Sequence, residues 1–322
     1  MSRSAGVDSS GARLRRIEAA LAGAFVLALT CGACRREVPR PPAAPPPVTP
    51  IVIRVTGAGL KSPESVLYDS VADAYLVSSI NGNAFARDDN GFISRIAPDG
   101  RVTALQWIAG GAHGVVLNGP KGMGIKGDTL FVADIDAVRL FDRRSGAPLA
   151  SVLIPGATFL NGIAIGPDGS VYITDTGIQP AGAGSVRSGA DALWMLGPGH
   201  RPVAIARGDS LGGPNGIIAD GSGVTMVTLG SGQVFHFDLA GKRRELPKPP
   251  NGALDGIVQL ADRSLLITSW QANVVYRLAP GGQYSVAVPG ATSPAGIGWD
   301  PTRHRLLIPL LTLDQVEIRE LR

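Results

Sequence analysis

The chain has 322 residues and a formal net charge of +4, with 43 glycines and 25 prolines. The length is ample for one large core, and so mild a charge, without a clustered basic patch, argues against a nucleic-acid partner. Aromatic residues make up only 5% of the chain, so we expect a core built mainly of Val, Ile, Leu and Ala. The many glycines and prolines indicate many tight turns.

The first 33 residues have the features of an export signal. Arg13, Arg15 and Arg16 form a basic start, and an apolar stretch of 12 residues, 19–30, follows. Such a stretch is too short to span a bilayer comfortably and is typical of a secretory signal peptide. We therefore predict that residues 1–33 are a signal peptide and that the protein is exported to the periplasm or cell envelope.

Both cysteines of the chain, Cys31 and Cys34, lie at the end of this segment, so the body can form no internal disulfide. Gly32 and Ala33 before Cys34 resemble a bacterial lipoprotein signal, although Cys31 stands where Leu is usual. Three outcomes stay open: lipidation at Cys34, cleavage after Ala33 without a lipid, and an uncleaved anchor. Lipidation is the favoured prediction, and the membrane is then contacted only through the lipid.

The next segment, residues 34–50, is predicted to be a linker. Residues 38–50 contain seven prolines and no glycine. This composition is typical of a stiff polyproline spacer. We expect it to hold the body away from a membrane surface.

Residues 51–322 contain a short phrase that recurs six times, x-Gly-Ile or a near variant followed by an apolar run. The copies begin at Glu64, Lys121, Asn161, Asn215, Asp255 and Ala295. These positions are 57, 40, 54, 40 and 40 residues apart. A repeat of about 40 residues built from strands and turns is typical of a β-propeller.

Each complete repeat predicts four short strands, joined by turns such as Pro-Asp-Gly at 167–169. In chain order, we expect strands over 122–125, 129–133, 137–141 and 149–152; 162–165, 170–174, 192–196 and 202–206; 216–218, 224–227, 233–237 and 243–246; 256–258, 264–268, 274–278 and 284–287; and 296–299, 305–308 and 316–319.

The last repeat lacks its outer strand, and residues 51–55 form a lone strand before the first repeat. We expect this strand to complete the last blade and close the ring, which removes exposed sheet edges. Insertions at 81–91, 108–119 and 178–190 are expected to be loops over the faces. The predicted fold is an all-β, six-bladed β-propeller with four-stranded blades over residues 51–322.

The first residue of each phrase opens an innermost strand, so these six residues should meet at one mouth of the central channel. We call them the axial ring: Glu64, Lys121, Asn161, Asn215, Asp255 and Ala295. Four of them carry hard oxygen donors, which suit Ca²⁺, with Mg²⁺ or Mn²⁺ next. No Cys or His belongs to the ring, which argues against zinc. Each Asn or Asp before Gly is by itself an ordinary turn residue, so the prediction depends on the set.

Glu, Asn, Asn and Asp in that order at the starts of inner strands resemble the senescence marker protein/gluconolactonase family, to which diisopropyl fluorophosphatase and the paraoxonases are similar. The resemblance covers residues 51–322 and is loose outside the ring. It implies that Glu64, Asn215 and Asp255 ligate a divalent cation and that Asn161 contacts the cation or the substrate. It also implies that Asp255 acts as general base or nucleophile in hydrolysis of lactones or phosphoesters, with the cation polarising the substrate oxygen.

Three further residues are candidates for substrate contact. Lys121 departs from an all-oxygen ring, and its ammonium could compensate the charge of Glu64, bind an anionic substrate or point away. His113 lies in a loop leading to the channel mouth, although a lone loop histidine is more often incidental. Trp270 follows a second strand and could line the mouth or cap the core.

The sequence therefore predicts a divalent-cation-dependent hydrolase of lactone-like or ester-like small molecules at the channel mouth. It contains no Gly-x-Ser-x-Gly nucleophile elbow and no phosphate-binding loop. The alternative is a non-catalytic ligand-binding or protein-interaction propeller of the cell envelope, since propellers of the similar NHL type often act this way and fold alone does not decide function.

Overall fold

The computed structural model describes residues 50–182 and 184–321. The predicted signal peptide, Cys34 and nearly all of the linker lie outside these residues. The described part contains no α-helix, only three single-turn 3₁₀ helices at Pro198–His200, Asp209–Leu211 and Leu311–Leu313. None of the helices in these two ranges is long and apolar enough to cross a membrane.

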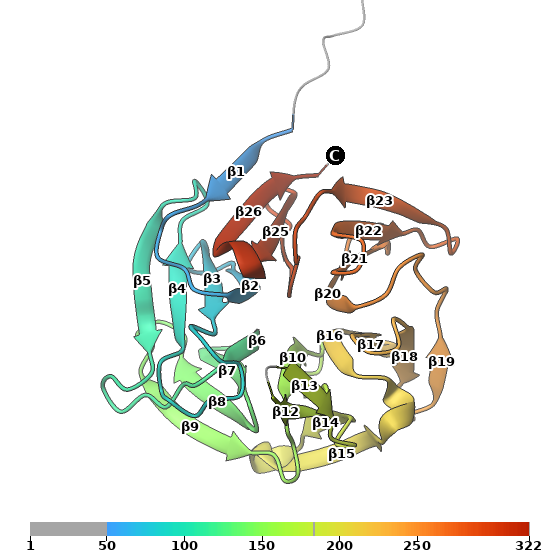
Figure 1. Ribbon diagram of the computed structural model, residues 1–322, viewed down its shortest axis with the longest axis horizontal. Helices are drawn as coiled ribbons and strands as arrows, with labels where there is room; N and C mark the ends of the chain where they lie inside the picture. The colour runs from blue at the N-terminus through green and yellow to red at the C-terminus, as the bar shows by residue number, and fades with distance from the viewer. Residues whose placement is uncertain (1–49, 183, 322) are drawn as a thin grey trace, which may run out of the picture. The chain divides into compact units, whose positions relative to one another are not determined.

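Six four-stranded antiparallel sheets stand around a central axis like the blades of a propeller (Figure 1). Blade 1 holds β2 (Pro63–Asp69), β3 (Ala74–Ser79), β4 (Phe92–Ile96) and β5 (Val102–Ala109); blade 2 holds β6 (Pro120–Lys126), β7 (Thr129–Asp134), β8 (Ala137–Asp142) and β9 (Pro148–Leu153); blade 3 holds β10 (Leu160–Ile165), β11 (Val171–Asp175), β14 (Ala192–Leu196) and β15 (Pro202–Arg207). Blade 4 holds β16 (Pro214–Asp220), β17 (Gly223–Thr228), β18 (Val234–Asp238) and β19 (Arg243–Glu245); blade 5 holds β20 (Leu254–Gln259), β21 (Leu265–Ser269), β22 (Val274–Leu278) and β23 (Tyr284–Pro289); blade 6 holds β24 (Gly298–Asp300), β25 (Arg305–Leu310), β26 (Gln315–Glu320) and β1 (Val52–Val55). The six-bladed, all-β prediction is confirmed.

The ring of blades closes in two places. At the outer edge, β1 pairs with β26 in antiparallel register, with Val52 opposite Arg319. At the inner edge, the Gly296 amide donates to the Glu64 carbonyl at 2.8 Å, and the Val66 amide donates to the Gly296 carbonyl at 3.0 Å. The prediction that the N-terminal strand completes the last blade is therefore confirmed, and the closure joins two ends of the propeller that lie far apart in the sequence.

The apolar core lies between the blades rather than within any one of them. Six clusters of buried residues each join one blade to its neighbour. Between blades 2 and 3, for example, Phe131 packs in one cluster with Ile163 and Trp194. A single blade therefore cannot bury its own apolar faces, and the stack must be complete to be stable.

The insertion at 178–190 differs from its prediction as a loop. Ile178–Ala181 (β12) and Gly184–Arg187 (β13) pair as an antiparallel hairpin, a separate two-stranded sheet. Gly182 at the turn has φ +56°, a left-handed conformation that glycine adopts without strain. The insertion at 81–91 carries no strand, in agreement with its prediction. The predicted loop at 108–119 begins too early, because Ile108 and Ala109 still pair in β5, and only residues 110–119 carry no strand.

Five of the six phrases have a glycine after the ring residue, with Ser65 in its place in the first, and this glycine allows neighbouring inner strands to approach closely. A Cβ atom on Gly216 would overlap the backbone oxygen of Asp255 on the next blade, and one on Gly162 would overlap the backbone oxygen of Asn215. Backbone cannot move aside as a flexible side chain can. The glycines therefore set the spacing of the blades at the axis, and with it the spacing of the ring residues beside them.

We expect Gly216→Ala to destabilise the protein by about 3 kcal/mol, because overpacking against a fixed backbone costs this much. Gly221→Ala is the matched control, since Gly221 lies in the same hairpin and nothing lies within 4 Å of an added Cβ. Urea unfolding of the two variants checks the prediction. Equal stabilities would contradict the spacing role of Gly216.

Candidate functional site

The ring residues lie at irregularities in the inner strands. The pairing of β10 with β11 shifts register between Leu160 and Ile163, around Asn161. The same shift occurs around Asn215 in β16 and around Asp255 in β20. A β-bulge re-aims a side chain relative to a regular strand. The bulges thus accompany the turn of the Asn161, Asn215 and Asp255 side chains into the channel.

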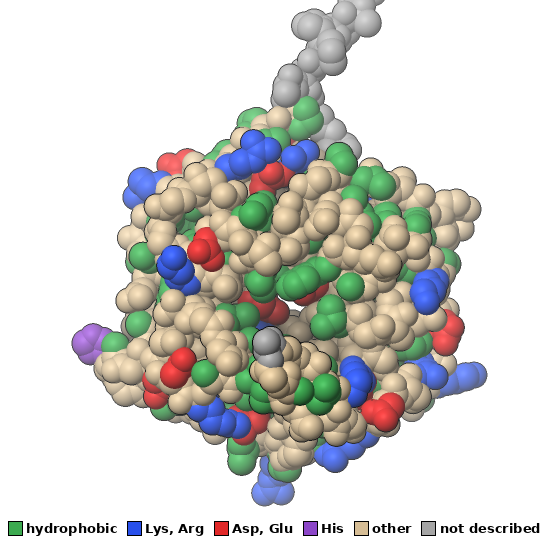
Figure 2. Space-filling model, in the orientation of Figure 1, with side chains coloured by type: hydrophobic (Ala, Val, Ile, Leu, Met, Phe, Trp, Pro, Cys, Tyr) green, Lys and Arg blue, Asp and Glu red, His purple; other side chains and the backbone are tan. Residues whose placement is uncertain are grey.

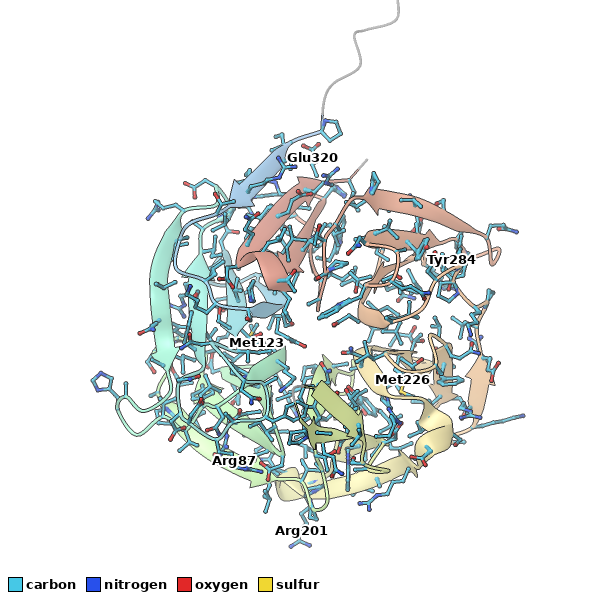
Figure 3. The ribbon with its side chains drawn as sticks, viewed as in Figure 1. Arg87, Met123, Arg201, Met226, Tyr284 and Glu320 are labelled. Atoms are coloured by element: carbon cyan, nitrogen blue, oxygen red, sulfur yellow. The ribbon has the colours of Figure 1, made fainter. Side chains whose placement is uncertain are left out.

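These side chains lie at one end of a central channel of about 590 Å³. The channel is lined by Glu64, Asn161, Asn215 and Asp255, and its walls continue with aliphatic residues of the inner strands. Figure 2 shows acidic side chains deep in the central hollow. In Figure 3, Met123 on β6 lies beside the channel, whereas Arg201 lies at the outer rim. The structure therefore brings the four oxygen-bearing ring residues to one cavity.

The two carboxyl groups of the ring are buried together. Glu64 and Asp255 are each 5% exposed. Burial raises the pKa of Asp255 to about 7, although the Trp270 indole and the Asn215 amide favour its ionised form. Burial and the nearby Asp255 charge raise the pKa of Glu64 well above its usual range, against the opposing charge of Lys121. Two like charges buried side by side disfavour each other, and a cation between them would favour the ionised form of both.

The amides complete the oxygen set. The Asn161 Nδ2 donates to Thr176 Oγ1 at 3.0 Å, and the Asn215 Nδ2 donates to the Leu254 carbonyl at 3.4 Å. Asn215 Oδ1 is buried and has no hydrogen-bond partner among the described residues. An unsatisfied buried acceptor costs about 1–3 kcal/mol, so its presence beside two carboxyl groups indicates a missing partner.

This donor set fits a hard divalent cation such as Ca²⁺. The four groups offer only oxygen, from two carboxylates and two amides, which Ca²⁺ accepts in flexible geometry. The described parts of the chain hold no group of three or more His, Cys, Asp or Glu placed to bind a metal ion. The amide oxygens of Asn161 and Asn215 must therefore take part if the ring holds a metal.

Lys121 is turned away from the channel. Its side chain is fully buried, and its Nζ donates to the Gly119 carbonyl at 2.8 Å and lies 4.0 Å from the centre of the Phe159 ring. Burial lowers the pKa of Lys121 to about 8, while the charges of Glu64, Asp134 and Asp175 oppose the shift. The ammonium thus acts on Glu64 through space, without an ion pair to it.

The other two predicted contacts, His113 and Trp270, are not among the residues that line the channel. His113 is exposed in the loop between β5 and β6, with φ +51°. Trp270 follows β21, its backbone amide donates to the Ala253 carbonyl, and its Nε1 is buried without a hydrogen bond of ordinary geometry to the described residues. The indole N–H is nevertheless near enough to Asp255 to lower the pKa of that carboxyl.

Sequence reasoning missed the hydroxyl groups behind the ring. Thr174 Oγ1 accepts from the Gly162 amide at 2.8 Å and donates to the Asn215 carbonyl at 2.5 Å, joining blades 3 and 4. Thr268 links the Gly256 amide to the Ala295 carbonyl in the same way. A Ser or Thr at this place in β3, β11 and β21 was the signal in the sequence that could have revealed these links.

Fold and channel together define a six-bladed propeller with an oxygen-lined axial site. No protein-family model and no curated protein sequence matches the chain. Solved structures do match, at low identity, and these likenesses establish the fold.

The gluconolactonase of Xanthomonas campestris is 16% identical, with a TM-score of 0.63 over 85% of this chain and 90% of that one. Regucalcin of Agrobacterium tumefaciens, a calcium-binding protein, is 16% identical, with a TM-score of 0.57 over 84% of this chain and 95% of that one. Virginiamycin B lyase of Staphylococcus aureus is 14% identical, with a TM-score of 0.60 over 85% of this chain and all of that one. The predicted resemblance to gluconolactonase-type propellers is confirmed at the level of the fold.

Proposed function

We propose that this protein is a divalent-cation-dependent hydrolase of lactone-like or ester-like small molecules, acting at the axial ring. The observation that carries the proposal is the convergence of four oxygen-bearing side chains, Glu64, Asn161, Asn215 and Asp255, on one cavity. The orphaned Asn215 Oδ1 and the two buried carboxyl groups support a cation among them. The likenesses to a gluconolactonase and to a calcium-binding regucalcin also support the proposal.

A cation held by these residues would polarise the carbonyl or phosphoryl oxygen of the substrate. Asp255 would then take a proton from water at a carboxylate oxygen, or attack the substrate itself. A cation beside Asp255 would favour its ionised form, and a general base must be ionised to accept the proton. Aliphatic residues such as Ile163 and Ile257 form the channel walls next to the ring.

The cellular setting is part of the proposal. The basic start, the apolar stretch and Cys34 support export and a lipid anchor in the cell envelope. A small molecule is the proposed partner, reaching the ring through the channel. We propose no nucleic-acid partner, because the net charge of +4 is mild.

A non-catalytic ligand-binding propeller is the second candidate, and Lys121 favours it. The buried ammonium places a fixed positive charge close to Glu64. If that charge alone balances the carboxylates, the ring needs no cation and a hydrolase loses its Lewis acid.

Calcium titration by calorimetry tests the cation site. We expect the purified protein to bind Ca²⁺ and Glu64→Gln to weaken binding by more than about 100-fold, since loss of even an outer partner costs 10–100-fold. Glu245→Gln, at an exposed position on β19, is the control and should bind as the wild type does. A well-folded wild-type protein that binds no Ca²⁺ would favour the ligand-binding propeller.

A further inference from the structure

Thr176, directly after β11, is fully buried, and each of its polar groups has a defined partner. Its amide donates to the Phe159 carbonyl at 3.0 Å, and its carbonyl accepts from Arg187 Nη1 at 3.0 Å. Its Oγ1 donates to the Pro214 carbonyl at 2.7 Å and accepts from Asn161 Nδ2 at 3.0 Å. The residue is therefore held at every polar atom, and it touches the ring through Asn161.

The direction of the hydroxyl bond fixes the direction of the amide. A hydroxyl has one proton, and the Pro214 carbonyl can only accept it. Because its one proton is given to Pro214, the Thr176 hydroxyl can only accept a hydrogen bond from Asn161. The Asn161 side-chain amide must therefore present its Nδ2 to Thr176. Asn161 Oδ1 is left facing the channel. The two ends of an amide have nearly the same shape, so packing alone would not prevent a flip that presents N–H donors to a cation.

We propose that Thr176 is a positioning residue that fixes Asn161 as an oxygen donor to the ring. This inference rests on the proposed cation site. It also links the inserted hairpin to that site, because Arg187 of β13 pairs with Asp191 and holds the Thr176 carbonyl. An outer partner that orients a metal ligand typically contributes 10–100-fold to affinity.

The test is a double-mutant cycle on Ca²⁺ affinity, measured by calorimetry. Thr176→Val keeps the shape but removes the hydroxyl, and we expect about tenfold weaker binding. Thr176→Ser keeps the hydroxyl and should bind within about twofold of the wild type. Asn161→Asp offers oxygen in either orientation, so Thr176→Val added to Asn161→Asp should cause no loss.

Two outcomes would overturn the positioning role: an equal loss from Thr176→Val in the wild-type and Asn161→Asp backgrounds, or no loss in either. Thermal unfolding and circular dichroism show whether each variant is folded. If Thr176 had only a structural role, Thr176→Val would lower stability equally in the wild-type and Asn161→Asp backgrounds. It would then also change the Ca²⁺ affinity by the same factor in both. A wild-type protein that binds no Ca²⁺ would instead overturn the proposed cation site, and the inference with it.

Discussion

Asp255→Asn should lower the turnover of any substrate by more than about 10³-fold, while the protein folds normally, because proton transfer by a positioned base typically contributes 10²–10⁴-fold. The substitution keeps the size of the side chain but removes the negative charge and the basic oxygen. It also removes one of the two carboxylates that would hold the cation. A panel of sugar lactones, aliphatic lactones, aryl esters and phosphotriesters, assayed with Ca²⁺, provides the measurement.

The control is Asp262→Asn, the same chemical change at an exposed carboxylate paired with Arg277. It should leave turnover unchanged. Without a cation, Asp255→Asn should be at least as stable as the wild type near pH 8, because it removes one of two like charges from a buried site. Turnover equal to that of the wild type would remove Asp255 from the mechanism.

The repeat made the fold predictable. Six copies of one phrase and a missing outer strand were enough to place the blades and the closure by residues 51–55, because stacked repeats allow few alternatives. The hairpin at 178–190 was less accessible, since two four-residue strands joined at Gly182 have little periodicity to recognise.

The site was predictable in its members but not in its details. The ring residues follow from the repeat, because equivalent positions meet at the axis. The direction of the Lys121 side chain does not, since it depends on the Phe159 ring, which only the packing of blades 2 and 3 brings to it. The contact between Thr176 and Asn161 also cannot be predicted from the sequence. Its direction depends on the hydrogen bond that the Thr176 hydroxyl donates to the Pro214 carbonyl of the next blade.

The affinity of the ring for Ca²⁺ should depend on pH. Calcium must displace protons from the ring, because burial raises the pKa of Asp255 to about 7 and that of Glu64 well above its usual range. Affinity for Ca²⁺ should therefore rise with pH, by about tenfold per unit for each proton displaced, below the pKa of the group that loses it. Calorimetry at three pH values, from mildly acidic through neutral to mildly alkaline, measures this directly.

The raised pKa values of Asp255 and Glu64 also determine how the stability of the cation-free protein changes with pH. A carboxyl whose pKa is higher in the folded than in the unfolded protein contributes stability below the unfolded value of about 4, which is lost as pH rises through the folded pKa. The cation-free protein should thus melt at a lower temperature at about pH 8 than at about pH 5. Hydrogen bonds from Ser264 and Arg277 lower the pKa of Asp262 to about 2. An exposed carboxyl with a lowered pKa of this kind therefore changes the stability of the protein only at more acidic pH.

Saturating Ca²⁺ should remove this loss, because the bound cation favours the ionised carboxylates. The gain in melting temperature from Ca²⁺ over a chelator should therefore be larger above the pKa of Asp255 than below it. The double variant Glu64→Gln/Asp255→Asn has neither group to titrate and should lose the part of the pH dependence that Ca²⁺ removes. The contributions of Asp175, whose pKa is raised by burial, and of His236, whose pKa is lowered by burial, should remain. The contrary outcome is a wild-type protein that, with Ca²⁺ removed by a chelator, becomes more stable as pH rises through neutrality. It would show that the charges of the ring carboxyls are balanced without a cation. Lys121 would then supply the balancing charge, as the ligand-binding alternative requires.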